Sequence, residues 1–250
     1  MRRYRYDGSF EGYLCAVSRC LADGVEAAEF LRDDPPLEAG LFPEPPANVE
    51  RDRDCADGFR QRFVAVVSEE AFTTLRYAFH SEHPGRERLL WEYVRLGLQT
   101  GRRVGSLLAD ERVNSVERLA RAVVREVHKY RGFVRFREVE EGFFYARIEP
   151  EADIIRFLAP HFVQRVGDRP WMIHDLRRSR AALYDLKTWR LLRDITLTDS
   201  PCFTDAEHEC AGLWQRYFQR LAIEARHNPE LQQKHVPLRN RKHMVEFDDV

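Results

Sequence analysis

The sequence HKYRGFVRFREVEEGFFYARIEPEADIIRFLAPHF, residues 128–162, predicts a helix, then a hairpin, then a second helix. Apolar residues at and before its start recur every three or four positions, which is typical of a helix with one buried face. They are Val116, Ala120, Val123, Val127 and Tyr130. Two runs rich in β-branched and aromatic residues, 133–139 and 143–148, then predict paired strands joined by residues 140–142. We expect Gly132 to end the first helix, so that its last turn leads directly into the sheet.

The composition is that of a globular protein without membrane segments. Of the 250 residues 44% are apolar and 32% charged, with a net charge of −1. No apolar run approaches the ~18 residues needed to cross a bilayer. The first residues, 1–13, carry charges and tyrosines where a signal peptide needs an apolar run. We therefore expect a cytoplasmic protein with no membrane contact.

The cysteines disfavour a disulfide framework and a clustered metal site. There are five, an odd number, and none forms a C-x-x-C pair. Residues 205–210 include metal-capable side chains, but one helix cannot place all of them on one face. We expect reduced thiols, no bound metal and no cofactor.

We predict a single α+β domain over residues 1–250, with a mainly helical N-terminal half. The C-terminal half should hold a small antiparallel sheet of about four or five strands with flanking helices, because the links between the strand-like runs look too short for crossovers. Eleven acidic residues face only three arginines between residues 23 and 57, and prolines crowd the middle of this segment. It therefore predicts a solvated acidic loop. A last long helix should start at Asp205 and lead into a basic tail, residues 226–250.

Side chains that cap helices predict where several helices begin. Ser9 and Ser68 precede apolar periodic runs and are expected N-caps. Asn114 with Glu117 has the form of a capping box for the central helix. Pro150 should lie in the first turn of the helix after the hairpin.

Basic residues concentrate on the central helix and the start of the hairpin. Between Arg112 and Arg137 there are eight Lys or Arg against two glutamates. Several lie three or four residues apart, so one helix face should carry them opposite the valine stripe. They include Arg118, Arg121, Arg125, His128 and Lys129. Such a row can neutralise phosphates of a nucleic acid. The alternative is a solvated surface balanced by nearby acids.

The hairpin could extend this surface. Arg131, Arg135 and Arg137 would share one face if all three lay on its first strand, near Phe143 and Tyr145. Arginines and aromatic rings on a sheet face can pair and stack with nucleotides. The alternative is the water-exposed face of an antiparallel sheet. Arg102 and Arg103, in a glycine-rich segment, are further candidates for phosphate contact.

Acid–base candidates are individually weak. His128, His161, Glu149 and Asp175 fall at the ends of predicted elements, where catalytic groups often lie. A histidine near a helix end is, however, more often a structural residue. The sequence lacks a phosphate-binding P-loop, a G-x-S-x-G motif, an H-E-x-x-H motif and a dinucleotide-binding glycine fingerprint. Common nucleotide hydrolases and metalloproteases are therefore disfavoured.

Several segments together resemble one bacterial family. The segments are YDGSFEG (6–12), SEEAFTTLRYAFHSE (68–82), EYVRLG (92–97), GRRV (101–104), HKYRGFVRFRE (128–138), FYARIEPEADII (144–155), LAPHF (158–162), IHD (173–175), LWQRYF (213–218) and NPELQQKHVP (228–237). In combination they are similar to the DUF4130 family, whose members are described as DNA metabolism proteins. The resemblance runs through nearly the whole chain.

The resemblance implies a nucleic-acid context and a partner. Members of the family are encoded beside a radical SAM protein of DNA repair or modification, and some are fused to a uracil-DNA glycosylase-like domain. Iron–sulfur chemistry would then belong to the partner. This chain has LRNRKH at 238–243 where relatives continue with K-R-Y-W-K, so it keeps the positive charge and lacks the aromatic pair.

Three functions follow as hypotheses. The first is an accessory DNA-binding protein that uses Arg121, Arg125, His128, Lys129, Arg131 and Arg135, aided by Arg102 and Arg103. The second is an enzyme acting on damaged or modified DNA or nucleotides through the acid–base candidates. The third is a protein adaptor that docks the radical SAM partner through the acidic loop or the last long helix.

Overall fold

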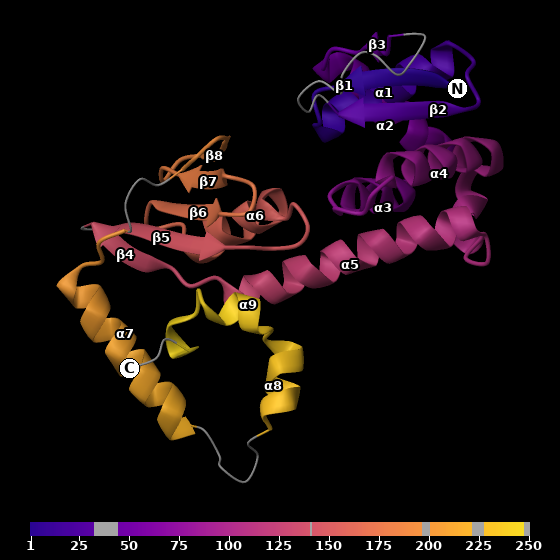
Figure 1. Ribbon diagram of the computed structural model, residues 1–250. Helices are drawn as coiled ribbons and strands as arrows, with labels where there is room; N and C mark the ends of the chain where they lie inside the picture. Colours follow the sequence, from indigo (N-terminus) through magenta and orange to yellow (C-terminus); the bar gives the residue numbers. More distant parts are fainter. Residues whose placement is uncertain (33–44, 141, 197–200, 222–227, 248–250) are drawn as a thin grey trace. The chain divides into compact units, whose positions relative to one another are not determined.

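The computed structural model describes residues 1–32, 45–140, 142–196, 201–221 and 228–247 (Figure 1). The chain divides into two compact units, residues 1–124 and 125–250, and the division falls inside the long helix α5 (Glu111–Phe133). Both units combine helices with a sheet, so the predicted α+β class is confirmed. That the whole chain forms a single domain stays a prediction.

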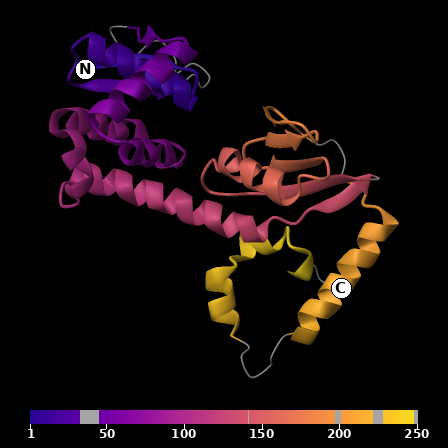
Figure 2. The same cartoon turned by 180° about the vertical axis from the view of Figure 1, so that it is seen from behind.

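Unit 1 has a small parallel sheet with the strand order β2-β1-β3. Its strands are β1 (Arg2–Tyr6), β2 (Ala28–Arg32) and β3 (Ala47–Asn48). Its helices are α1 (Phe10–Ala22), α2 (Arg53–Val66), α3 (Glu69–Phe79), α4 (Arg86–Thr100) and the 3-10 helix η1 (Gly101–Ser106), followed by the first part of α5. Figure 2 shows the same elements from behind.

The predicted acidic loop, 23–57, is shorter than expected. Strands β2 and β3 lie within it, and α2 begins at Arg53. The reason is that Ala28 and Phe30, on one face of β2, are buried, so this strand contributes to the core. The proline-rich centre of the segment, residues 33–44, lies outside the described residues.

Two of the predicted helix caps are confirmed and one is wrong. The hydroxyl oxygens of Ser9 and Ser68 accept hydrogen bonds from the third following amides, at 3.0 and 3.1 Å. Helix α5, however, begins at Glu111, before Asn114. The carboxylate of Asp110 accepts from the Arg112 amide at 3.0 Å, so an earlier acidic side chain displaces the predicted cap.

The core of unit 1 is aromatic and contains a buried charge cluster. Glu87, on α4, accepts hydrogen bonds through Oε1 from the Tyr6 hydroxyl at 3.0 Å and from Arg32 Nε at 2.9 Å. Arg86 Nε lies 3.3 Å from the same oxygen, and the Arg86 guanidinium lies over the Phe79 ring. Burial would raise the pKa of Glu87, but Arg86 and Arg32 outweigh it and lower that pKa. The carboxylate therefore lies inside a ring of donors.

Unit 2 contains a five-stranded sheet with the order β4-β5-β6-β7-β8. The strands are β4 (Arg137–Glu140), β5 (Phe143–Ile148), β6 (Trp171–Asp175), β7 (Arg180–Tyr184) and β8 (Trp189–Leu192). Three neighbouring pairs are antiparallel, as predicted, but β5 and β6 are parallel. The link between them contains α6 (Ile155–Arg165), which packs on the sheet (Figure 1). This helix makes a crossover connection, although the links between strands were predicted to be too short for one.

Three element boundaries in the opening stretch differ from the prediction. Helix α5 continues through Gly132 to Phe133, and β4 starts only at Arg137. Helix α6 begins at Ile155 and not at Pro150, because the preceding amides of Glu151 and Ala152 donate to the Glu126 carboxylate at 2.7 and 2.8 Å. The apolar stripe predicted for α5 is buried, so the periodicity identified its packed face correctly, and Ile155, Leu158 and Phe162 of α6 are buried as well.

The C-terminal part of unit 2 begins with the predicted last long helix, α7 (Asp205–Leu221). Where a basic tail was predicted, the chain forms α8 (Pro229–His235), α9 (Leu238–Arg241) and the 3-10 helix η3 (Val245–Phe247). Met244 and Val245 are buried, and the Tyr130 hydroxyl donates to Asn240 Oδ1 at 2.8 Å. A few apolar residues among many charges thus fix the end of the chain to unit 2. Within the described ranges, no helix has the length and apolar character that a bilayer crossing requires.

Candidate nucleic-acid interface

Helix α5 carries the predicted row of cations on its exposed face. The valine stripe and Tyr130 are buried, and the basic side chains lie opposite them. Exposed members are Arg118, Arg121, Arg125, His128 and Lys129, and Arg131, which was predicted on the hairpin, is exposed in the last turn of the same helix. The division between the two units falls just before Arg125, so the last four belong to unit 2.

Most of these cations in unit 2 are not neutralised by a partner. Arg121, in unit 1, forms an exposed ion pair with Glu117 at 3.4 Å. In contrast, the side chains of Arg125, His128, Lys129 and Arg131 form no hydrogen bond or ion pair with the described residues. Exposed cations without partners keep their charge available for an anionic ligand.

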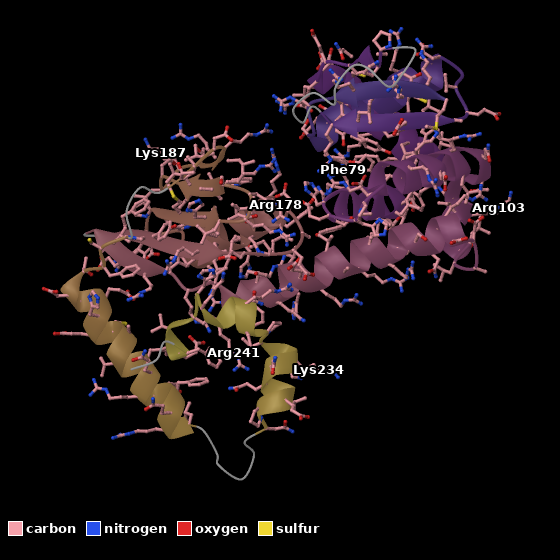
Figure 3. All side chains as sticks on the ribbon, in the orientation of Figure 1. Phe79, Arg103, Arg178, Lys187, Lys234 and Arg241 are labelled. Atoms are coloured by element: carbon pink, nitrogen blue, oxygen red, sulfur yellow. The ribbon has the colours of Figure 1, made fainter. Side chains whose placement is uncertain are left out.

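The remaining predicted phosphate contacts lie elsewhere. Arg102 and Arg103 are exposed on η1 of unit 1, where Figure 3 labels Arg103. Arg135 lies in the link between α5 and β4 and not on a strand. Its guanidinium forms an ion pair with the carboxylate of Glu246 at 2.5 Å.

A hollow in unit 2 gathers further cations. It contains about 320 Å³ of empty space, partly open to solvent. We call it the cationic hollow, and its lining residues are Arg135, Arg137, Tyr145, Arg147, Phe203, Lys242, His243 and Val245. They come from the α5–β4 link, from β4 and β5, from the segment before α7, from the segment between α9 and η3, and from η3 itself. Among the residues that the structure describes, no acidic side chain lines it.

The local strand geometry explains half of this assembly. Arg137 of β4 pairs with Tyr145 of β5 in the antiparallel register. Arg147 follows Tyr145 by two residues and therefore projects from the same face of β5. The two hairpin strands thus place two arginines and an aromatic ring on one side of the sheet.

Carboxylates hold three of the cations from outside the lining. Arg135 pairs with Glu246, Arg137 Nε pairs with Glu207 at 3.1 Å, and Lys242 Nζ pairs with Glu149 at 2.7 Å. Burial would raise the pKa of Glu246, but its hydrogen bond with Arg135 lowers it overall. These ion pairs fix the cations in position.

Arg147 differs from the other cations of the hollow. It is half-buried on β5, and its guanidinium forms no hydrogen bond or ion pair with any described residue. Its charge acts on two neighbours. Burial raises the pKa of Tyr145 and the charge of Arg147 partly offsets this rise, and the same charge contributes to lowering the pKa of His243. One full positive charge is thus left uncompensated at the hollow.

The aromatic side chains are positioned by their polar contacts. The Tyr145 hydroxyl lies 2.8 Å from His174 Nδ1, and His174 Nε2 lies 3.2 Å from the Ile195 carbonyl oxygen. Because a carbonyl can only accept, Nε2 carries the proton and Nδ1 accepts from the tyrosine. Burial lowers the pKa of His174, which favours this neutral form. Phe203 stacks beneath the Arg137 guanidinium, 3.6 Å from the ring centre.

The acid–base candidates are not brought together. His128 is exposed on α5, and Asp175 is buried in an ion pair with Arg178 at 2.9 Å. Burial and the charges of Arg131 and Arg165 lower the pKa of His161, while Glu149 binds Lys242 and His243. No described hydrogen bond or ion pair joins any two of the four. The enzyme hypothesis stays a prediction.

The described residues also provide no clustered metal ligands. Nowhere among them do three or more His, Cys, Asp or Glu side chains come close enough to hold an ion. All five cysteines are free thiols, and two of them, Cys15 and Cys20, are buried in unit 1.

Sequence reasoning missed part of the cationic hollow. The alternation along β5 that singles out Tyr145 also includes Arg147, so this residue could have been found. Phe203, Lys242 and His243 reach the hollow from distant segments, and no local pattern indicates where they meet. Arg135 and Arg137 were expected beside Tyr145, and the hollow places them there.

Fold and site together define an α+β protein with a cation-rich surface and a hollow suited to an anionic ligand. The chain matches the DUF4130 family, described as a domain of unknown function, over residues 84–246, which is well over half of its length. It therefore belongs to the DUF4130 family. The matched range includes all of the α5 row and the cationic hollow. No curated protein matches the chain.

Proposed function

We propose that this protein is an accessory nucleic-acid-binding protein of a DNA repair or modification system. One observation carries the proposal: Arg125, His128, Lys129 and Arg131 are exposed on α5, and their side chains form no hydrogen bond or ion pair with the described residues. Surface cations of this kind bind the phosphate backbone and release its counterions. The resemblance to DNA metabolism proteins supports DNA as the nucleic acid.

Charge reversal in this row tests the proposal. The double variant Arg125→Glu with Arg131→Glu should bind a duplex or single-stranded oligonucleotide at least tenfold more weakly. The slope of log affinity against log salt concentration should fall by about two units, since two phosphate contacts are lost. Fluorescence anisotropy across a salt series measures both quantities.

A matched control reverses two exposed cations elsewhere in unit 2. Lys187, labelled in Figure 3, and Arg193 are exposed near β8, and their side chains form no ion pair with the described residues. The variant Lys187→Glu with Arg193→Glu makes the same change in net charge and should retain affinity. Equal affinity and salt slope in the α5 variant and the wild type would reject the proposed surface.

A second proposal concerns the partner. Helix α7 has no buried residue, and its apolar side is exposed over several turns. Exposed apolar side chains are Leu213, Trp214, Tyr217, Phe218 and Leu221. A contiguous apolar surface of this kind is typical of a protein contact. The radical SAM protein implied by the family resemblance is the partner that we propose.

Co-purification after nuclease treatment tests this contact. The wild-type chain should retain the radical SAM protein without nucleic acid, and Leu213→Asp with Leu221→Asp should lose it. The variant Arg220→Ala, on the same helix, should keep it. Complexes that nuclease treatment destroys would show that DNA, and not α7, joins the two proteins.

A further inference from the structure

We propose that the cationic hollow of unit 2 binds one nucleotide, with its phosphate at Arg147 and its base against Phe203. This inference rests on the proposed nucleic-acid function and specifies a second contact apart from the α5 row. The ligand class is a nucleoside phosphate, either free or as one unit of a strand.

The arrangement of charges favours an anion. The carboxylates of Glu246, Glu207 and Glu149 all lie outside the lining, and each holds a cation that faces the hollow. Cations held in this way need little reordering when a ligand arrives, which reduces the cost of binding. In a cluster of ion pairs that only stabilises the fold, we would expect the carboxylates to line the hollow together with the cations.

Arg147 provides the specific phosphate contact. It lines the hollow, is half-buried, and has no hydrogen-bond or ion-pair partner within the described ranges. A guanidinium offers two parallel donors that match two phosphate oxygens. Because its neighbours Arg135 and Arg137 already have carboxylate partners, Arg147 is the cation whose charge an anion would neutralise.

His243 supplies a second polar group. Its Nε2 lies 3.0 Å from Glu149 Oε1, while its buried Nδ1 has no hydrogen-bond partner among the described residues. A buried polar atom without a partner is unusual in a folded protein and is often satisfied by a ligand. Lys242, the neighbouring residue, adds an ammonium group to the same lining.

The Phe203 ring indicates that the ligand has a planar part. Phe203 is partly exposed, lines the hollow together with the cations and is fixed by its contact with Arg137, whereas the Tyr145 ring is buried. Bases stack on aromatic side chains regardless of sequence. An inorganic anion alone would leave the Phe203 ring unused.

Binding measurements with four ligands test this assignment. The ligands are thymidine 5′-monophosphate, a single-stranded oligothymidylate, an abasic oligomer of equal length, and inorganic phosphate. Arg147→Gln should weaken oligothymidylate binding by about tenfold and reduce the salt slope by about one unit. Phe203→Leu should weaken binding of the oligothymidylate several-fold and leave the abasic oligomer unaffected.

The source of the nucleotide follows from the same measurements. If Arg147→Gln weakens binding of the oligomer, the hollow binds one nucleotide unit of the strand. If it weakens only the monophosphate, the hollow binds a free nucleotide. Lys187→Glu serves as the control in each case, and the thermal midpoint verifies that every variant is folded.

The failure of this inference is distinguishable from the failure of the proposed function. Suppose that Arg147→Gln binds all four ligands as the wild type does, while the α5 double variant binds DNA more weakly. This result would overturn the nucleotide site at the hollow and leave the proposed function standing. Unchanged binding in both variants would overturn both. If Phe203→Leu weakened binding of the abasic oligomer and of oligothymidylate equally, base stacking on Phe203 would be rejected.

Discussion

The two units use ion pairs in opposite ways. In unit 1 the carboxylate of Glu87 lies inside a ring formed by Tyr6, Arg32 and Arg86, and its charge is satisfied within the core. In unit 2 the carboxylates lie behind the cations, which line an open hollow where Arg147 has no partner among the described residues. The comparison indicates that the first arrangement stabilises the fold and that the second presents charge to a ligand.

The largest expected effect is the loss of the charge on Glu87. Glu87→Gln should lower the free energy of unfolding by about 3–5 kcal/mol, because it leaves two arginines uncompensated in a largely buried place. Chemical denaturation measures the change. DNA affinity of the folded variant should be unaltered.

Glu92 provides the control on the same helix. It forms a more exposed ion pair with Arg88 at 3.5 Å, so Glu92→Gln should cost less than about 1 kcal/mol. Similar destabilisation by the two variants would show that the ring around Glu87 has no special structural role.

A smaller effect is expected for Glu149 in unit 2. Glu149→Gln should loosen the segment that carries Lys242 and His243 by about 1 kcal/mol, because a partly exposed ion pair is lost. Hydrogen exchange of the amides at 242–247 should accelerate at neutral pH. Glu230→Gln, on exposed α8, should leave it unchanged.

The pH dependence of this segment has a defined sign. Burial raises the pKa of Glu149, but Lys242 and His243 outweigh it, and the pKa falls below its ordinary value of 4.5 in the folded state. The stabilisation is therefore complete above pH 4.5 and is lost as the pH falls through the folded pKa. Protection of 242–247 that is insensitive to acid would contradict the role of this carboxylate.

The smallest effect concerns the buried His174. Burial lowers its pKa below 6.5, so the unfolded chain binds a proton before the folded chain does. Stability should therefore decrease as the pH falls below 6.5 and level off below the folded pKa. Thermal midpoints between pH 7.5 and 5 should show this decrease, and His174→Gln should reduce its slope. An unaltered slope would mean that other groups cause it.

The sequence predicted the packed faces better than the meeting of distant segments. The periodicity of Val116 to Tyr130 identified the buried side of α5, and alternation placed Arg137 beside Tyr145. The parallel pairing of β5 and β6 was missed because the length of the α6 crossover was underestimated. Phe203 and Lys242 meet at the hollow through tertiary contacts, which no local spacing encodes.

The predicted helix ends were wrong where one local sequence signal competed with another. Gly132 was expected to end α5, but the helix continues past it to Phe133. Glycine lowers helix stability by about 1 kcal/mol, and the buried Tyr130 and Val134 on either side offset that cost. Arg131 consequently lies on the helix with the other exposed cations and not on the hairpin.

Photochemical cross-linking tests the central claim, that the hollow of unit 2 binds a nucleotide, most directly. An oligonucleotide containing 5-iodouracil reacts on irradiation with aromatic rings that contact the base, and mass spectrometry identifies the attached residue. We expect attachment at Phe203, strongly reduced in Arg147→Gln. Attachment confined to other residues, or unchanged attachment in that variant, would contradict it.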